Sequence, residues 1–161
     1  MLTESEKYFY TTDTGKSWFP LNARAPPNGF GLSVLHFHPI QSDYLIWIGQ
    51  RDCEAFGPNC HVEAFYTRDN GRNWFEIDTY VRNCGWARDA ELRIDANQIL
   101  CESYLKKSGN QKFFQNDNPL ELISGTDFYR KRTKLFNHVV GFAKFSEFLI
   151  VAEVSRSAKN P

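Results

Sequence analysis

The stretch Thr67-Arg68-Asp69-Asn70-Gly71-Arg72-Asn73-Trp74 decides the fold of this chain, because the same pattern stands earlier as Thr11-Thr12-Asp13-Thr14-Gly15-Lys16-Ser17-Trp18. Both octets read Thr-x-Asp-x-Gly-x-x-Trp, and each follows an aromatic segment that is typical of a β-strand. Subtracting the first positions (67 − 11) gives a period of 56 residues. A repeat at a fixed period of tens of residues is typical of solenoids, propellers and other arrays.

The residue types of the octet predict a tight turn between two antiparallel strands. An Asp side chain accepts hydrogen bonds from backbone amides two or three positions on, and a Gly two places later supplies the positive φ that such a turn requires. The first Thr extends the strand, while the closing Trp folds back across the turn and buries a large apolar face. This account gives a structural rather than a catalytic role to Thr11, Asp13, Gly15, Trp18, Thr67, Asp69, Gly71 and Trp74.

The octet resembles the Asp-box, also called the bacterial neuraminidase repeat (BNR), which occurs on the hairpin between the third and fourth strands of β-propeller blades. The resemblance implies an all-β fold built from such blades. It does not by itself select a function, since sialidases, other glycosidases, reelin-like proteins and sorting receptors all carry Asp-boxes.

Composition supports an all-β protein and excludes several kinds of partner. The chain has 161 residues, with 16% aromatic side chains and a single Met, which favours strands over a helical bundle. The formal net charge of zero argues against binding nucleic acid or anionic lipid by bulk charge. Apolar runs such as 148–152 are of strand length, so no transmembrane helix is expected and the segment itself is expected to make no membrane contact. The first residues lack the pattern of a secretory signal peptide.

Taken in order, residues 1–161 predict a partial β-propeller of about two to three blades. Residues 1–20 make half a blade, residues 32–78 make a four-stranded blade, and a third unit over 92–136 has no intact box. A hairpin over 138–153 opens a fourth unit, and blade breaks are expected near 22–31, 79–91 and 137. A propeller closes as a ring of about four to eight blades, so we expect a fragment of a larger propeller.

The residues around the second box carry a further resemblance. Tyr44–Gln50 leads into a Cys-bounded loop and then the box, which is followed by Tyr80–Ala87 and Ile99–Tyr104. This order resembles the luminal ten-bladed propeller of the sortilin-type family of vacuolar protein sorting receptors, and is most similar to its fungal members that carry carboxypeptidase Y. The segment Phe142–Val151 fits as well, so the resemblance covers nearly the whole chain.

The resemblance implies a cargo receptor rather than an enzyme, without a cofactor. Its partners would be soluble vacuolar hydrolase precursors of the carboxypeptidase Y kind, bound in the Golgi lumen and released at the endosome. It names no cargo-contact residue here. Family likeness and proximity in sequence pair Cys53 with Cys60 and Cys84 with Cys101, which requires an oxidising lumen.

Two alternatives to a cargo receptor stay open at this point. One is an Asp-box glycosidase fragment, although no paired carboxylates or Tyr-Glu pair stand at a telling spacing. The other is a receptor-derived piece without autonomous function. The histidines His36 and His38 alternate on one strand without a third metal ligand at a telling spacing, and the basic run Arg130-Lys131-Arg132 with Lys134 is typical of a solvated face.

Overall fold

Every regular element of this computed structural model is a β-strand, within the residues that the structure describes: 7–26, 34–53, 60–87, 97–104, 120–145 and 148–153, the side chains of 141–150 excepted. The strands are β1 (Tyr8–Tyr10), β2 (Phe19–Leu21), β3 (Leu35–Phe37), β4 (Leu45–Arg51), β5 (His61–Thr67), β6 (Phe75–Thr79), β7 (Val81–Trp86), β8 (Ile99–Tyr104), β9 (Leu120–Thr126), β10 (Lys131–Phe145) and β11 (Phe148–Glu153).

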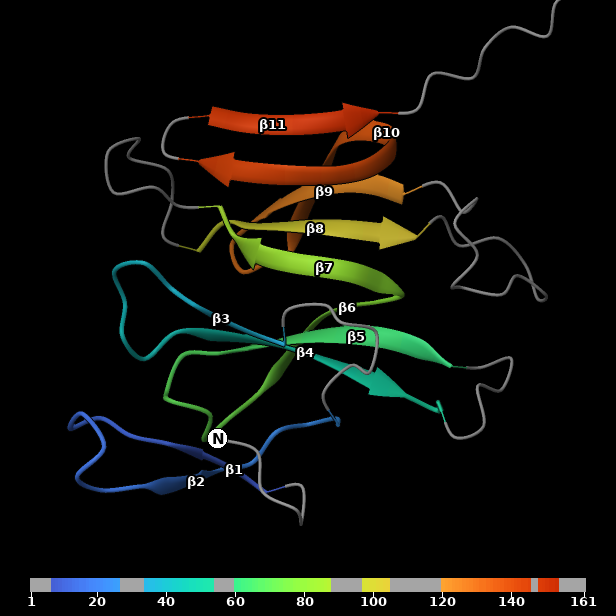
Figure 1. Cartoon of the computed structure of the whole chain (residues 1–161). Helices are drawn as coiled ribbons and strands as arrows, with labels where there is room; N and C mark the ends of the chain where they lie inside the picture. Colours follow the sequence, from blue (N-terminus) through green and yellow to red (C-terminus); the bar gives the residue numbers. More distant parts are fainter. Residues whose placement is uncertain are drawn as a thin grey trace, which may run out of the picture.

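The strands form three antiparallel sheets that are stacked in chain order (Figure 1). The middle sheet has the order β3-β4-β5-β6, which is the meander of one propeller blade, and its Asp-box joins the third strand to the fourth. The first sheet pairs β1 with β2 around the other box, which makes it equivalent to β5 and β6 of the middle sheet. The predicted all-β partial propeller is confirmed.

The third sheet has the order β11-β10-β9-β8-β7 and differs from the expected third unit at its first strand. We expected a break over 79–91, but β7 lies inside it, and only Tyr80, with a φ of 58°, separates β6 from β7. This strand could not be predicted from the sequence of β7, because Asn83 and Gly85 are poor strand formers. A bulge also interrupts the alternation of buried and exposed side chains. The strand that we expected at 92–94 lies outside the described residues.

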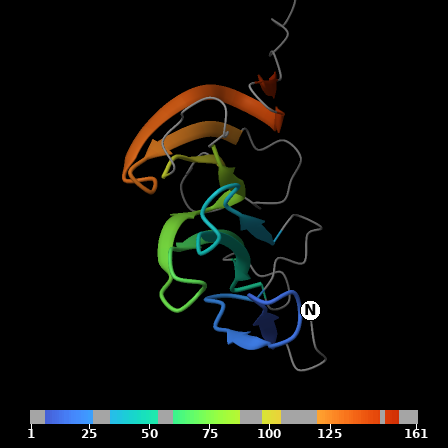
Figure 2. The ribbon, with the colours of Figure 1, turned by 90° about the vertical axis from the view of Figure 1, so that its left-hand side faces the viewer.

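The expected break near 137 also differs from the structure, in which β10 runs through it as one strand of 15 residues. Its first half pairs with β9 and its second half with β11, and the register shifts between Phe136 and Val139. His138 has a φ of 54° at this bulge. Because both halves keep a ladder partner, the strand bends instead of ending, and Figure 2 shows β10 arching over β9 along the outside of the molecule. The hairpin of β10 and β11 therefore extends the third sheet.

The break expected near 22–31 falls between β2 and β3, and its second part lies outside the described residues. The hairpin between β9 and β10, where no box was found, turns through three successive residues of positive φ, namely Asp127, Phe128 and Tyr129. The Phe128 amide donates to the carbonyl of Asn97, and the buried Tyr129 packs directly over Gly125. Tertiary packing closes this turn in place of an Asp side chain.

Two apolar cores join the three sheets. The smaller core lies between the first and middle sheets and includes Leu21, Trp47 and Trp74. The larger core is shared by the middle and third sheets, and Ile46 and Tyr66 from one side meet Cys101 and Tyr129 from the other. Neighbouring sheets therefore bury their faces against each other, as blades of a propeller do.

Candidate binding surfaces and the Asp-box hairpins

The second Asp-box is held by hydrogen bonds within its own octet. The Thr67 hydroxyl donates to Asp69 Oδ1 over 2.7 Å and accepts from the Gly71 amide over 3.0 Å. Asn73 donates to the same carboxylate twice, from its backbone amide over 2.9 Å and from its side-chain nitrogen over 2.7 Å. Burial raises the pKa of Asp69, but these bonds outweigh it and the net shift is downward. Both carboxylate oxygens are thus engaged inside the turn.

The first box repeats this geometry. The Thr11 hydroxyl donates to Asp13 Oδ1 over 2.8 Å and accepts from the Gly15 amide over 2.9 Å. Ser17 replaces Asn73 and donates to the Asp13 carboxylate from both its hydroxyl and its backbone amide. These bonds from Ser17, the hydroxyl first, lower the pKa of Asp13 to about 2. In both boxes the residue before the Gly and the Gly itself have positive φ.

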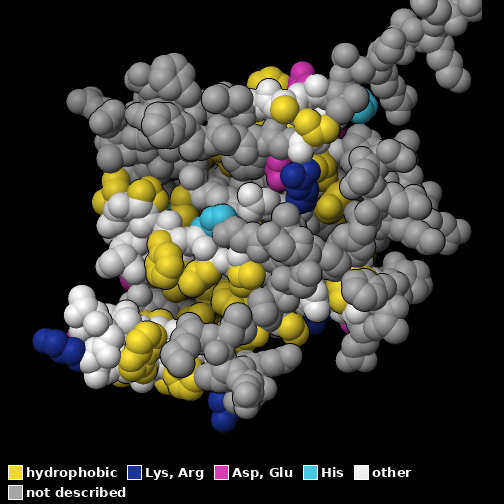
Figure 3. Space-filling view, viewed as in Figure 1, with side chains coloured by type: hydrophobic (Ala, Val, Ile, Leu, Met, Phe, Trp, Pro, Cys, Tyr) yellow, Lys and Arg dark blue, Asp and Glu magenta, His cyan; other side chains and the backbone are white. Residues whose placement is uncertain are grey.

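The two boxes differ in what covers their Trp side chains. Trp74 is 8% exposed and belongs to the core that includes Leu21 of β2, whereas Trp18 is 51% exposed. Phe19, beside Trp18, is also exposed and packs against the ring of Tyr10 at a tilt of 35°. Hydrophobic side chains gather over the first and middle sheets on the face shown in Figure 3, where Lys and Arg stand singly. A shallow depression of about 500 Å³ lies over residues 7–9 and 20–23.

The structure places both predicted cysteine pairs in disulfides. Cys53 and Cys60 close the connection between β4 and β5. Cys84 and Cys101 lie directly opposite each other on β7 and β8, with 4.1 Å between their Cα atoms, and both are fully buried. The second disulfide therefore lies inside the core that the middle and third sheets share.

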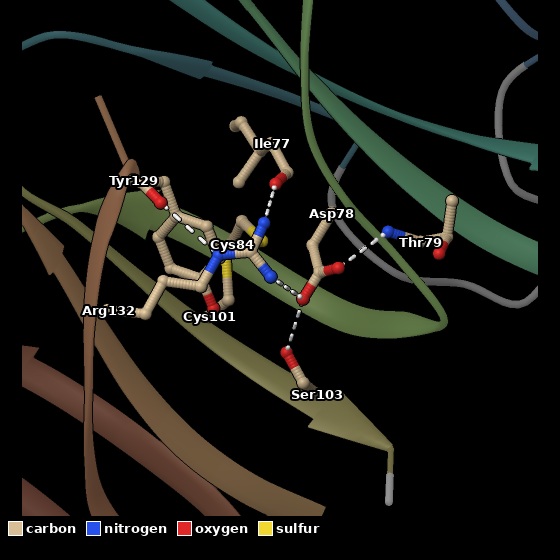
Figure 4. The surroundings of a disulfide bond; sticks show 8 residues. All are labelled: Ile77, Asp78, Thr79, Cys84, Cys101, Ser103, Tyr129 and Arg132. Carbon is tan, nitrogen blue, oxygen red and sulfur yellow. Dashed lines mark hydrogen bonds and ion pairs between the residues drawn. A yellow bond between two sulfur atoms is a disulfide. The ribbon is translucent and has the colours of Figure 1, made fainter. Parts of the chain in front are cut away.

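Around this disulfide, an ionic cluster joins the middle sheet to the third (Figure 4). Arg132 donates to the carbonyl of Ile77 over 3.0 Å and lies 3.3 Å from Asp78 Oδ2. It also donates to the carbonyl of Tyr129 and stacks on that ring, whose pKa burial raises to about 12. Ser103 donates to Asp78. Sequence reasoning missed this cluster, because the Ser103–Asp78 contact spans 25 positions and the Arg132–Ile77 contact spans 55.

His36 and His38, which were expected to share a strand face, contact neighbouring protein groups. His38 accepts at Nδ1 from the amides of Ile40 and Gln41 and packs edge-on against Trp86. His36 is half-buried, and this burial lowers its pKa while the Asn83 side chain opposes the shift. His61 lies 3.0 Å from Glu63, which also pairs with Arg51 over 2.8 Å. Within the described residues, no three His, Cys, Asp or Glu side chains are placed to hold a metal ion.

These features define a class of protein: a β-propeller whose Asp-boxes are engaged in their own turns and whose blades are fixed by disulfides. Comparison with known proteins gives the family, since the profile of Sortilin-Vps10 (Sortilin, neurotensin receptor 3) matches residues 1–160. The chain belongs to this family of sorting receptors. The described residues contain no helix that is long and apolar enough to cross a membrane.

Curated relatives are named "Vacuolar protein sorting/targeting protein 10". The protein of Laccaria bicolor is 59% identical over 96% of this chain. That of Mycosarcoma maydis is 49% identical over 100% of the chain, and that of Paracoccidioides brasiliensis is 35% identical over 94%. The chain spans about a tenth of the length of these relatives, 10% or 11% in each case.

Proposed function

We propose that this chain is part of the luminal cargo-binding propeller of a sorting receptor that carries soluble hydrolases from the Golgi to the endosome or vacuole. The carrying observation is the family match over residues 1–160, together with relatives whose names state vacuolar sorting and targeting. The partners in this proposal are vacuolar hydrolase precursors of the carboxypeptidase Y kind. The two disulfides support an oxidising Golgi or endosome lumen as its compartment.

The proposal includes no enzymatic activity. In a glycosidase, paired carboxylates must reach the glycosidic bond. Here, the carboxylates of Asp13 and Asp69 each accept several bonds from their own octets, which supports a role in holding the hairpins. The same role is proposed for the Thr, Gly and Trp of each box.

A direct binding measurement tests the proposal. The chain would be secreted from a eukaryotic host, checked for both disulfides, and immobilised for interferometry against a carboxypeptidase Y precursor and against a secreted enzyme that is not vacuolar. Saturable binding of the precursor alone is the expected result. Equal binding of both proteins, or of neither, by a monodisperse folded chain would refute it. Binding of neither protein would favour a receptor-derived piece without autonomous function. Hydrolysis of a sialoside by the chain would favour the alternative of a glycosidase fragment.

A further inference from the structure

The first half of β10 has one edge without a partner among the described strands. Residues 131–136 pair with β9 along one edge, whereas β11 pairs with β10 only from Val139 to Phe145. All side chains from 131 to 137 are exposed. An unpaired strand edge presents a row of backbone amides and carbonyls, onto which another extended chain can add as a further strand.

The side chains along this edge favour an added chain that carries negative charge. Four cations stand within five positions, at 130, 131, 132 and 134. Arg132 is engaged by Asp78 and Lys134 by Glu121, over 3.3 and 3.0 Å. Arg130 and Lys131 have no carboxylate within ion-pair distance among the described residues. They supply positive charge that the described residues do not neutralise.

This charge discriminates between the two kinds of strand that could add to the edge. A second copy of β10 that added in parallel register, or antiparallel about residues 130–134, would bring the same cations opposite each other, and like charges directly opposite oppose pairing. An acidic strand would gain from the same cations. Beyond the cations, Leu135 and Phe136 are 42% and 38% exposed, so the far end of the edge offers apolar contacts.

We propose that the open edge of β10, residues 131–137, binds an extended acidic segment of a partner protein by strand addition. Carboxylates of the segment lie against Arg130 and Lys131, and apolar side chains lie against Leu135 and Phe136. This interaction is separate from hydrolase sorting, because it needs only an acidic extended chain and the described edge.

The test uses a fluorescein-labelled peptide of four Glu-Thr repeats followed by two Val residues, with binding to the full chain followed by anisotropy. Two matched peptides serve as controls: one carries Lys for every Glu, and the other keeps the Glu residues but is N-methylated at every second amide, which removes the ladder hydrogen bonds along one edge. Two versions of the N-methylated peptide, one for each edge, cover both possible orientations. We expect the acidic peptide to bind, and the Lys peptide and at least one N-methylated version to bind at least roughly tenfold more weakly.

Variants locate the binding on the chain. Arg130→Glu with Lys131→Glu reverses the two unpaired cations, and we expect roughly tenfold weaker binding of the acidic peptide. Lys16→Glu with Arg24→Glu changes the net charge equally on exposed residues next to the first sheet, in its hairpin turn and after β2, and should leave binding within about twofold. Near-ultraviolet circular dichroism checks that both variants fold.

Four outcomes would overturn the proposal. The first is failure of the acidic peptide to bind, and the second is unchanged binding of both N-methylated versions, which would reduce the effect to charge alone. The third is an equal loss in the two charge-reversed variants, which would mean that net charge and not this edge decides. The fourth is self-association of the chain that depends on Arg130 and Lys131 and resists the peptide, which would assign the edge to a second copy.

Discussion

Gly15 and Gly71 hold the same position in the two Asp-boxes but have different surroundings. Both have positive φ, 94° and 81°, so a Cβ at either site strains the backbone. A Cβ on Gly71 would also collide with the Leu21 side chain, whereas the described neighbour of one on Gly15 would be Trp18, at 3.8 Å. We expect Gly15→Ala to cost about 1–2 kcal/mol of unfolding free energy, the usual cost of a side chain in the left-handed region, and Gly71→Ala about 1–3 kcal/mol more. Urea unfolding measures both, and equal losses would contradict the packing assigned to Leu21.

Asp13 makes the stability of the first hairpin dependent on pH. Hydrogen bonds from Ser17 lower its pKa in the folded chain from 3.8 to about 2. A depressed folded pKa stabilises the protein above the unfolded value, and this contribution disappears as the pH falls through the folded value. Stability should therefore fall between about pH 4 and pH 2 on account of Asp13, and Asp69 contributes with the same sign.

The variant Asp13→Asn isolates that contribution. It cannot ionise, so we expect its unfolding free energy to be lower at pH 5 and to fall less steeply between pH 4 and pH 2 than that of the native chain. Urea titrations at a series of pH values supply the comparison. Parallel curves for the two proteins would show that the Ser17 bonds do not stabilise the ionised form.

At this scale the sequence predicts what is local. Each box closes through contacts within eight positions, so its Thr, Asp and Gly could be assigned from residue types alone. The contact of Leu21 with the second box spans 50 positions (71 − 21), and nothing in either segment marks the other. The exposure of Trp18 could not be predicted for the same reason, because it depends on what a neighbouring blade supplies.

At the scale of elements, each disulfide closes a loop between consecutive strands. Cys84 and Cys101 are 17 positions apart, and Cys53 and Cys60 are 7 apart. In the chain-entropy model, removing the longer link costs about 3 kcal/mol and removing the shorter one about 2 kcal/mol. The longer link is also fully buried, so Cys84→Ala with Cys101→Ala should be the more damaging pair. Thermal unfolding of both double variants tests this order, and a larger loss at Cys53 and Cys60 would contradict it.

Strand identity could be predicted for the middle sheet and only partly for the third. The segments of β4 and β5 are apolar and rich in β-branched and aromatic residues, and they fold as expected. β7 instead forms a strand because it pairs with β8 and is linked to it by the Cys84–Cys101 disulfide. The residues of β7 alone do not predict this pairing. The continuity of β10 through His138 likewise follows from having a partner on each half.

For the whole molecule, the described sheets share their cores and so should unfold together. Tyr66 of the middle sheet stacks on Phe128 of the third, with ring centres 4.8 Å apart. Leu21 of the first sheet lies in the same core as Trp74 of the middle sheet. The apolar face of each sheet is covered by its neighbour, so separating the sheets would expose apolar surface on both of them.

Arg132 provides a specific test of that coupling. Its guanidinium joins Ile77 and Asp78 of β6 to Tyr129. Without it, the bonds that the buried Asp78 carboxylate keeps among the described residues are those from Thr79 and Ser103. The Ile77 carbonyl and the Asp78 carboxylate each lose a donor in Arg132→Ala. We therefore expect this variant to cost about 1–3 kcal/mol of unfolding free energy, the range for removing a partner of a buried polar group. Lys134→Ala removes the same charge from an exposed pair with Glu121 and should cost less than about 1 kcal/mol.

Hydrogen exchange followed by mass spectrometry distinguishes coupling from a local effect. If the cluster holds the two sheets together, Arg132→Ala should speed exchange in β6, β8 and β9 alike, while Lys134→Ala leaves all three nearly unchanged. Faster exchange confined to β10 would mean that Arg132 only anchors its own strand. In that case the cohesion of the middle and third sheets would rest on the shared apolar core, and Phe128→Ala, which removes the ring stacked on Tyr66, would be the variant that separates them.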